Sequence, residues 1–282
     1  MGVPCVIYDP LTWFWRKLPS VISHPNVLYL AQGFHGVQDI VKNKKEYFGN
    51  AQVVPPLIRK NHLLCEKKWV MINLGGLMNP FWSLNDCIHY ATTVVEAVSD
   101  VFRKKGDELI VLGNKQLEKV LPKHRIVTCS REEMKELLSR TKLAIATSGL
   151  GNIYESSAYN IPTLFLPPPG DSHGRQLQIL IEHGEVDEFI DWHNLHESMQ
   201  VDYHAEQVQV MQKIAKNIEG LSSSSHLKKT LSRLVQEKCN LLSRQSNSRT
   251  SQLLNQFGEN GATEIAQLAY NFIQSKKEGY VL

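Results

Sequence analysis

A glycine-rich turn between a predicted strand and a predicted helix is the first feature of this sequence that could do chemistry. The apolar residues 143–147 predict a buried strand, and Ser148, Gly149 and Gly151 follow it directly. Glycines there let the backbone approach a diphosphate, and the first helical turn offers free N–H groups and a partial positive charge. The G-x-G-x-x-G fingerprint is incomplete, because Tyr154 occupies its third glycine position. A turn formed for packing alone is the competing interpretation.

Glu155 adds a carboxylate to this turn. We expect it in the first turn of the helix, where it could accept hydrogen bonds from both hydroxyls of a ribose. It could also serve only to stabilise the helix dipole. The residues by themselves leave both roles open.

A polar loop is predicted after the next strand, Thr163–Leu166. Prolines 167–169 stiffen this loop, and a mixture of donors and acceptors follows within a few positions. Because open α/β sheets bind ligands at the carboxyl ends of their strands, we expect the loop to contact a ligand. The candidate residues are Asp171, His173, Arg175 and Gln176.

Further candidates lie outside these two segments. Gly75 and Gly76 end the first strand of the same unit, where they could approach a phosphate or simply turn the chain. The aromatic run 13–15 could belong to the core or stack on a flat acceptor ring. Asp9 and His35 are candidates for a general base near the first strands.

Histidines 193, 196 and 204 invite a metal interpretation, which we set aside. They have no fixed helical spacing with a carboxylate partner, so surface histidines are the better interpretation. The sequence predicts no metal site and no cofactor other than a donor substrate.

The elements that must position these residues alternate between short apolar runs and helix-length segments. This pattern is typical of an α/β fold with a parallel sheet covered by helices. Capping boxes at Ser83–Asp86 and Ser130–Glu133 predict two helix starts. The predicted strands are Cys5–Tyr8, Val27–Ala31, Ala51–Val54, Trp69–Leu74, Glu108–Leu112, Arg125–Thr128, Leu143–Thr147 and Thr163–Leu166.

Three regions are expected along the chain. Residues 1–60 resemble part of a Rossmann-like domain, residues 61–205 form a Rossmann-like domain, and residues 206–282 form a helical segment. Lys60 to Lys68 is polar enough to be a linker. Helices are predicted at 203–218, 227–242 and 262–275, with flexible serine-rich joints at 222–225 and 243–251.

Composition excludes several classes of protein. The 31 Lys and Arg exceed the 28 Asp and Glu by only three, which does not indicate a nucleic-acid partner. The five cysteines are scattered, predicting reduced thiols and a cytoplasmic protein. No apolar run approaches the ~20 residues of a membrane span, and the N-terminus lacks the pattern of a signal peptide.

The order of these motifs resembles the GT-B glycosyltransferases, which are built from two facing Rossmann-like domains. The likeness is to the nucleotide-sugar half of the peptidoglycan GlcNAc-transferase group and, more closely, to the cytosylglucuronate synthases of nucleoside-antibiotic pathways. The strings that carry it are Trp13-Phe14-Trp15, Val54-Pro55-Pro56-Leu57-Ile58, Gly75-Gly76-Leu77, Gly149-Leu150-Gly151-Asn152-Ile153-Tyr154 and Asp171-Ser172-His173-Gly174-Arg175-Gln176.

The resemblance implies a metal-independent, inverting glycosyltransferase that takes a UDP-sugar, such as UDP-glucuronate, and a small acceptor similar to cytosine. Glu155 would hold the ribose, the Ser148 to Gly151 turn would hold the diphosphate, and Gln176 and Asp171 would contact the sugar. The backbone near Ser130 and Arg131 would contact the base. From charge complementarity, Arg175 or His173 could pair with a uronic carboxylate.

The same resemblance implies that the opening strands of the acceptor domain have no counterpart here. We therefore expect the chain to bind a UDP-sugar but to need an upstream region, fused or as a second chain, for fast transfer. Two alternatives stay open: a non-catalytic sugar-nucleotide-binding subunit, and a sugar-nucleotide epimerase with the same architecture. The epimerase would need acid and base carboxylates along its cleft, and the predicted loops offer few.

Overall fold

The computed structural model describes residues 3–44, 48–60, 65–75, 77–245 and 247–278, apart from the side chains of residues 104 and 105. The chain divides into two compact units, a smaller one of Met1–Lys60 with Leu253–Leu282 and a larger one of Asn61–Gln252. The sequence-based division instead treated residues 206–282 as one helical segment.

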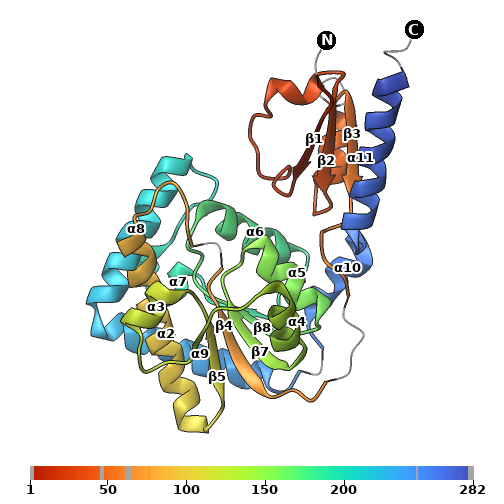
Figure 1. Cartoon of the computed structure of the whole chain (residues 1–282). Coiled ribbons are helices and arrows are strands. Elements are labelled where there is room, and N and C mark those ends of the chain that lie inside the picture. Colours follow the sequence, from red (N-terminus) through yellow and green to blue (C-terminus); the bar gives the residue numbers. More distant parts are fainter. Residues whose placement is uncertain (1–2, 45–47, 61–64, 76, 246, 279–282) are drawn as a thin grey trace. The chain divides into compact units, whose positions relative to one another are not determined.

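The smaller unit is a three-stranded parallel sheet in the order β1-β2-β3, with a helix from the far end of the chain packed on it (Figure 1). Leu28, Leu30 and Val54 on the sheet meet Ile265, Leu268 and Phe272 on α11, which buries apolar surface from both ends of the chain. The elements are β1 Cys5–Asp9, η1 Ser20–Ser23, β2 Val27–Gln32, α1 Val37–Asn43, β3 Asn50–Val54, α10 Gln252–Phe257 and α11 Gly261–Glu278.

A backbone connection holds the start of α11 against the segment after β3. The N–H of Asn260 donates to the carbonyl of Ile58 at 2.6 Å, and that of Gly261 donates to the carbonyl of Pro56 at 3.0 Å. A Cβ on Gly261 would lie 2.0 Å from the carbonyl oxygen of Pro55. Only glycine fits this close approach.

The larger unit contains a six-stranded parallel sheet in the order β6-β5-β4-β7-β8-β9. The strand order reverses between β4 and β7, so the sheet is doubly wound, with its topological switch point at that pair. The strands are β4 Trp69–Asn73, β5 Leu109–Leu112, β6 Ile126–Val127, β7 Thr141–Ala146, β8 Thr163–Phe165 and β9 Glu188–Phe189.

Helices cover both faces of this sheet (Figure 1). On one face, α2, α8 and α9 pack with Val70, Ile72 and Ile145 in the main core. On the other face, Met71 and Ala144 pack with α4. The helices are α2 Leu84–Lys105, α3 Lys115–Val120, α4 Arg131–Ser139, α5 Leu150–Ala158, α6 Asp171–Glu182, α7 Trp192–Leu195, η2 Glu197–Met199, α8 Gln207–Ser223, α9 Ser225–Leu242 and η3 Arg249–Ser251.

The α/β class, the eight predicted strands and both predicted capping boxes are confirmed. The loop predicted after β8 is wrong beyond Gly170, because α6 begins at Asp171. The serine joint at 222–225 is also wrong: α8 runs to Ser223, and Ser224 caps α9 by accepting from the N–H of Leu227. Serine is a poor helix former but a favoured N-cap, so the run marks a helix boundary instead of a flexible joint.

Candidate functional site

The N-terminus of α5 lies at the switch point of the larger sheet. Strand β7 ends at Ala146, and the N–H of Thr147 donates to the carbonyl of Asn73 at the end of β4 at 3.1 Å. Gly149 is the N-cap of α5, and no side chain caps the helix there. The first N–H groups of α5 therefore face the place where doubly wound sheets bind their ligands.

Asn152, for which no role was predicted, joins the ends of β4 and β7 at the switch point. Its Nδ2 donates to the carbonyl and the Oγ1 of Thr147 at 3.0 and 2.9 Å. The Oγ1 of Thr147 donates to the carbonyl of Gly75 at 2.6 Å, and the N–H of Gly75 donates to Oδ1 of Asn73 at 3.1 Å. Nδ2 of Asn152 also lies 3.4 Å from the carbonyl oxygen of Asn73. The Thr147–Gly75 and Asn152–Asn73 bonds join residues more than 70 positions apart, so no local sequence signal marks them.

A side chain at Gly75 would be crowded by two asparagine side chains. A Cβ there would lie 3.3 Å from Oδ1 of Asn73 and 3.4 Å from Oδ1 of Asn152. The backbone after β4 is thus held against the start of α5. Gly76, the second predicted glycine of this turn, lies outside the described residues.

Two fully buried aromatic side chains hold the proline segment before α6. The hydroxyl of Tyr90 donates to the carbonyl of Pro167 at 2.7 Å, and Nε1 of Trp192 donates to that of Pro168 at 2.8 Å. Ser148 donates from Oγ to the carbonyl of His173 at 2.9 Å. The N-terminal turns of α5 and α6 therefore adjoin, and both helices point partial positive charge toward the same place.

His173 and Gln176 are buried beside these turns. A Cβ on Gly149 would lie 3.1 Å from Nε2 of His173, so the imidazole ring lies against the glycine turn. Nδ1 of His173 and Oε1 of Gln176 have no hydrogen-bond partner among the described residues. Burial lowers the pKa of His173 to about 4, so its imidazole is neutral near neutral pH.

Asp171 begins α6 and is 9% exposed. Its Oδ2 accepts a hydrogen bond from Nε2 of Gln207 at 2.8 Å, and its Oδ1 accepts one from the N–H of Ser172, also at 2.8 Å. Arg175 is half-buried on the same helix. The structure places all four candidates of this segment on the first two turns of α6.

Glu155 lies in the second turn of α5, not in the first turn as expected, because the helix begins at Leu150. Burial raises the pKa of its carboxyl to about 7. Its charge also contributes to the raised pKa values of Cys129 and Tyr159. Glu155 is therefore close to the segment between β6 and α4, where the base contacts were expected.

Ser130 and Arg131 stand at the start of α4, and Arg131 is exposed. The N–H of Ser130 already donates to Oε2 of Glu133 at 2.7 Å, and its Oγ accepts from the N–H of Glu133 at 3.3 Å. The capping box thus engages the amide of Ser130.

The candidate bases lie in the smaller unit. The carboxylate of Asp9 accepts hydrogen bonds from the N–H of Leu11 at 2.7 Å, from Nε1 of Trp15 at 2.9 Å and from the hydroxyl of Tyr29. It therefore braces the turn after β1. His35 is 9% exposed and packs edge-on against Phe257 with ring centroids 5.0 Å apart.

The aromatic run divides between core and surface. Trp13 is buried and packs against Phe34, whereas Trp15 is 46% exposed. In the described part of the chain, no group of three or more metal-ligating side chains comes together. None of the described helices is both long and apolar enough to cross a membrane.

The chain is similar in fold to solved structures, but no comparison assigns it to a protein family. No protein-family model matches the sequence, and no curated protein matches it. Three similar solved structures are the glycotransferase of kitacinnamycin (12% identity, TM-score 0.42), Os79 from O. sativa in complex with UDP and deoxynivalenol-3-glucoside (13%, 0.41) and the spinosyn rhamnosyltransferase SpnG (12%, 0.42).

These similarities extend over most of this chain but only part of the other proteins. They cover 87%, 86% and 87% of this chain, in the same order. The chain spans 55%, 54% and 67% of those three proteins.

Proposed function

We propose that the larger unit binds the UDP part of a UDP-sugar and acts as the donor half of an inverting, GT-B-type glycosyltransferase. The observation that carries the proposal is the uncapped N-terminus of α5 at the switch point of a doubly wound sheet. Gly151 faces open space that a diphosphate could occupy, and free N–H groups with the helix dipole favour an anion. The end of β4 and the start of α6 adjoin the same place.

The nucleoside would lie on the side of Glu155. The half-buried carboxylate of Glu155 can accept hydrogen bonds from two ribose hydroxyls. Such donors would offset the loss of water around its charge. Cys129, close to this carboxylate, belongs to the β6–α4 segment. Because the N–H of Ser130 is engaged by Glu133, we assign base contacts to the remaining backbone groups of this segment.

The sugar would lie on the side of α6, within reach of Gln176 and Asp171. Oε1 of Gln176 can accept from a sugar hydroxyl. Because His173 is neutral, we assign the pairing with a uronic carboxylate, if the donor carries one, to Arg175 alone. Titrating UDP-glucuronate and UDP-glucose into the parent protein and Arg175→Ala tests this assignment. If Arg175 pairs with a uronic carboxylate, the substitution should weaken binding of UDP-glucuronate more than that of UDP-glucose.

The proposed transfer is a single displacement. An acceptor heteroatom attacks the anomeric carbon of the sugar, and the bond from that carbon to the β-phosphate oxygen breaks. UDP leaves with the bonding electrons, and the proton of the acceptor passes to a general base. The dipole of α5 stabilises the charge that develops on the departing phosphate.

The test is a Gly151→Ala variant. In the free protein, a Cβ at Gly151 meets nothing within 4 Å, and alanine is the better helix former, so stability should hold or rise. A diphosphate that approaches this backbone would clash with the methyl group, and UDP affinity should fall by about tenfold or more, or about 1.4 kcal/mol.

Gly220→Ala in α8 is the matched control, because its Cβ also meets nothing within 4 Å. Titration calorimetry with UDP, TDP and GDP measures the effect and the base preference together. UDP binding that is equally tight in Gly151→Ala and the parent protein would remove the diphosphate from this turn. Tighter binding of TDP or GDP would change the assigned base.

A further inference from the structure

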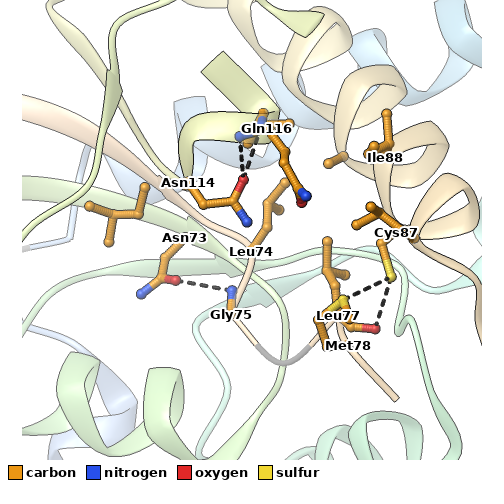
Figure 2. A pocket seen from close by; sticks show the side chains of 14 residues that line it. Asn73, Leu74, Gly75, Leu77, Met78, Cys87, Ile88, Asn114 and Gln116 are labelled. Carbon is orange, nitrogen blue, oxygen red and sulfur yellow. Dashed lines mark hydrogen bonds between the residues drawn. The ribbon is translucent and has the colours of Figure 1, made fainter. Parts of the chain in front are cut away.

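A cavity lies beside Gly75, against α2. It has a volume of about 390 Å³ and lies between the β4–α2 segment, the first half of α2 and the start of α3 (Figure 2). This volume lies in the usual range of small-molecule sites, roughly 300–1,000 Å³. Its floor is buried and apolar, formed by Leu74, Cys87, Ala91, Leu112 and Leu117.

The mouth of the cavity is apolar on one side and carries amides on the other. Met78 and Leu84 line it and are 70% and 41% exposed. Across the cavity from Met78, Asn114 and Gln116 are exposed lining residues (Figure 2). Oδ1 of Asn114 accepts from the N–H groups of Gln116 and Leu117, both at 3.0 Å, which holds the amide in place.

None of the described lining residues is charged. A charged ligand would lose its hydration there without gaining an ionic partner, so the cavity favours a neutral molecule. Large exposed apolar side chains beside a concave apolar floor are typical of a ligand site. The two amides can each donate or accept one hydrogen bond to a polar group of that molecule.

The cavity shares its wall with the proposed donor site. Asn73 and Gly75 line it, and both belong to the hydrogen-bonded network of Thr147 and Asn152 at the switch point. A molecule in the cavity would therefore lie beside the α5 turn proposed for the diphosphate, to which the anomeric carbon of the donor is bonded. The apolar body of an acceptor is the molecule that a transfer reaction needs at this position.

We propose that this cavity binds the apolar body of a neutral acceptor, with a polar group of the acceptor held by Asn114 and Gln116 beside Gly75. The assignment to an acceptor rests on the proposed function. The preference for a neutral, mainly apolar ligand rests only on the lining.

The neutral fluorophore N-phenyl-1-naphthylamine serves as the probe, because its emission rises in apolar surroundings. We expect saturable binding to the full chain. A lysine at the mouth places a charge beside the apolar ligand, so Met78→Lys and Leu84→Lys should each weaken binding about fivefold or more. Val208→Lys and Val120→Lys are the controls, since these valines are 54% and 43% exposed and do not line the cavity.

Cys87 gives a second, independent measurement. Its thiol lies in the cavity and donates to the carbonyl of Leu77 at 3.4 Å, and burial raises its pKa. Bound probe should slow its alkylation by N-ethylmaleimide severalfold, measured by peptide mass spectrometry. Alkylation of Cys129, which does not line the cavity, should not change.

The outcomes separate this proposal from the proposed function. Equal probe binding in all four lysine variants, with Cys87 unprotected, overturns the cavity site, whatever UDP does. If UDP binds the parent protein but leaves probe affinity unchanged, the cavity lies outside the reaction and the acceptor assignment is wrong. If both sites belong to one reaction, UDP should change the affinity for the probe. The probe should then change the affinity for UDP by the same factor.

Discussion

At the scale of single residues, burial sets the charge of the two titratable side chains nearest the α5 turn. Burial disfavours the charged form of any group, so it raises the pKa of Glu155 to about 7 and lowers that of His173 to about 4. The carboxylate is therefore half-ionised near neutral pH, and the imidazole is neutral. Sequence alone gives these residues their ordinary charges, which are negative for glutamate and partly positive for histidine.

Glu155→Gln tests the shifted carboxyl. The folded protein holds the proton of Glu155 up to about pH 7, whereas the unfolded chain releases it near the ordinary value of 4.5. The unfolding free energy of the parent therefore falls as pH rises between these values. At about pH 8 the variant should be more stable by roughly 1–3 kcal/mol. Near the ordinary pKa the two should differ little.

Urea unfolding at several pH values measures this difference, and a constant difference across the range would contradict the buried carboxyl. UDP titrations on the same two proteins test the ribose role. Ribose hydroxyls donate best to the ionised form, so parent affinity should drop on acidification through about pH 7 more than that of the variant. The variant is the control, because its UDP affinity changes with pH only through groups other than Glu155, including the phosphates of UDP.

At the scale of elements, α6 depends on a glycine in its interior. A Cβ on Gly174 would lie 2.0 Å from Cδ1 of Tyr203, and Tyr203 is fixed by donating to Oδ1 of Asp191 at 2.6 Å. The aromatic ring therefore packs directly on the helix backbone. This contact sets how closely α6 approaches the segment before α8.

Gly174→Ala should destabilise the protein by about 2 kcal/mol or more, although alanine favours helices by about 1 kcal/mol. The measurement is the midpoint of thermal or urea unfolding, with Gly220→Ala as the control in open space. In a Tyr203→Ala background the same substitution should cost far less, because the ring is gone. Equal costs in both backgrounds would show that the ring does not exclude a side chain.

At the scale of the whole molecule, a buried carboxylate anchors the last segment of the larger unit. Asp187 is 5% exposed and accepts hydrogen bonds from the N–H groups of Thr163 and Arg249, at 3.0 and 2.6 Å, and from Oγ of Ser248 at 2.6 Å. Just beyond Arg249, at Leu253, the chain enters the smaller unit. One side chain thus ties the sheet to the segment where the chain leaves the unit.

Asp187→Ala should leave two backbone N–H groups unsatisfied and lower the unfolding free energy by roughly 2–4 kcal/mol. Hydrogen exchange should rise most at Arg249, whose amide loses its acceptor. Asp202→Ala, an exposed aspartate that accepts from the N–H of His204, is the control and should change little. Unchanged exchange at Arg249 would contradict the anchoring role.

Local sequence patterns are sufficient to predict the class of the fold and most of its strands. Apolar runs of about five residues predict buried strands. A capping box such as Ser130–Glu133 predicts a helix start, because its hydrogen bonds join residues only three positions apart. The glycine turn at Gly149 was visible for the same reason. The two-residue strand β9 was not, because Glu188 and Phe189 form no pattern of their own.

Contacts between groups that are distant in the sequence follow from the folded arrangement. The sheet order brings Asn73 to Asn152 and Thr147, and the fold places Tyr203 on Gly174 and α11 on β2. It also decided the protonation of Glu155 and His173, since burial depends on everything packed around a side chain. Such contacts arise from residues tens of positions apart, so the local patterns of the sequence cannot contain them.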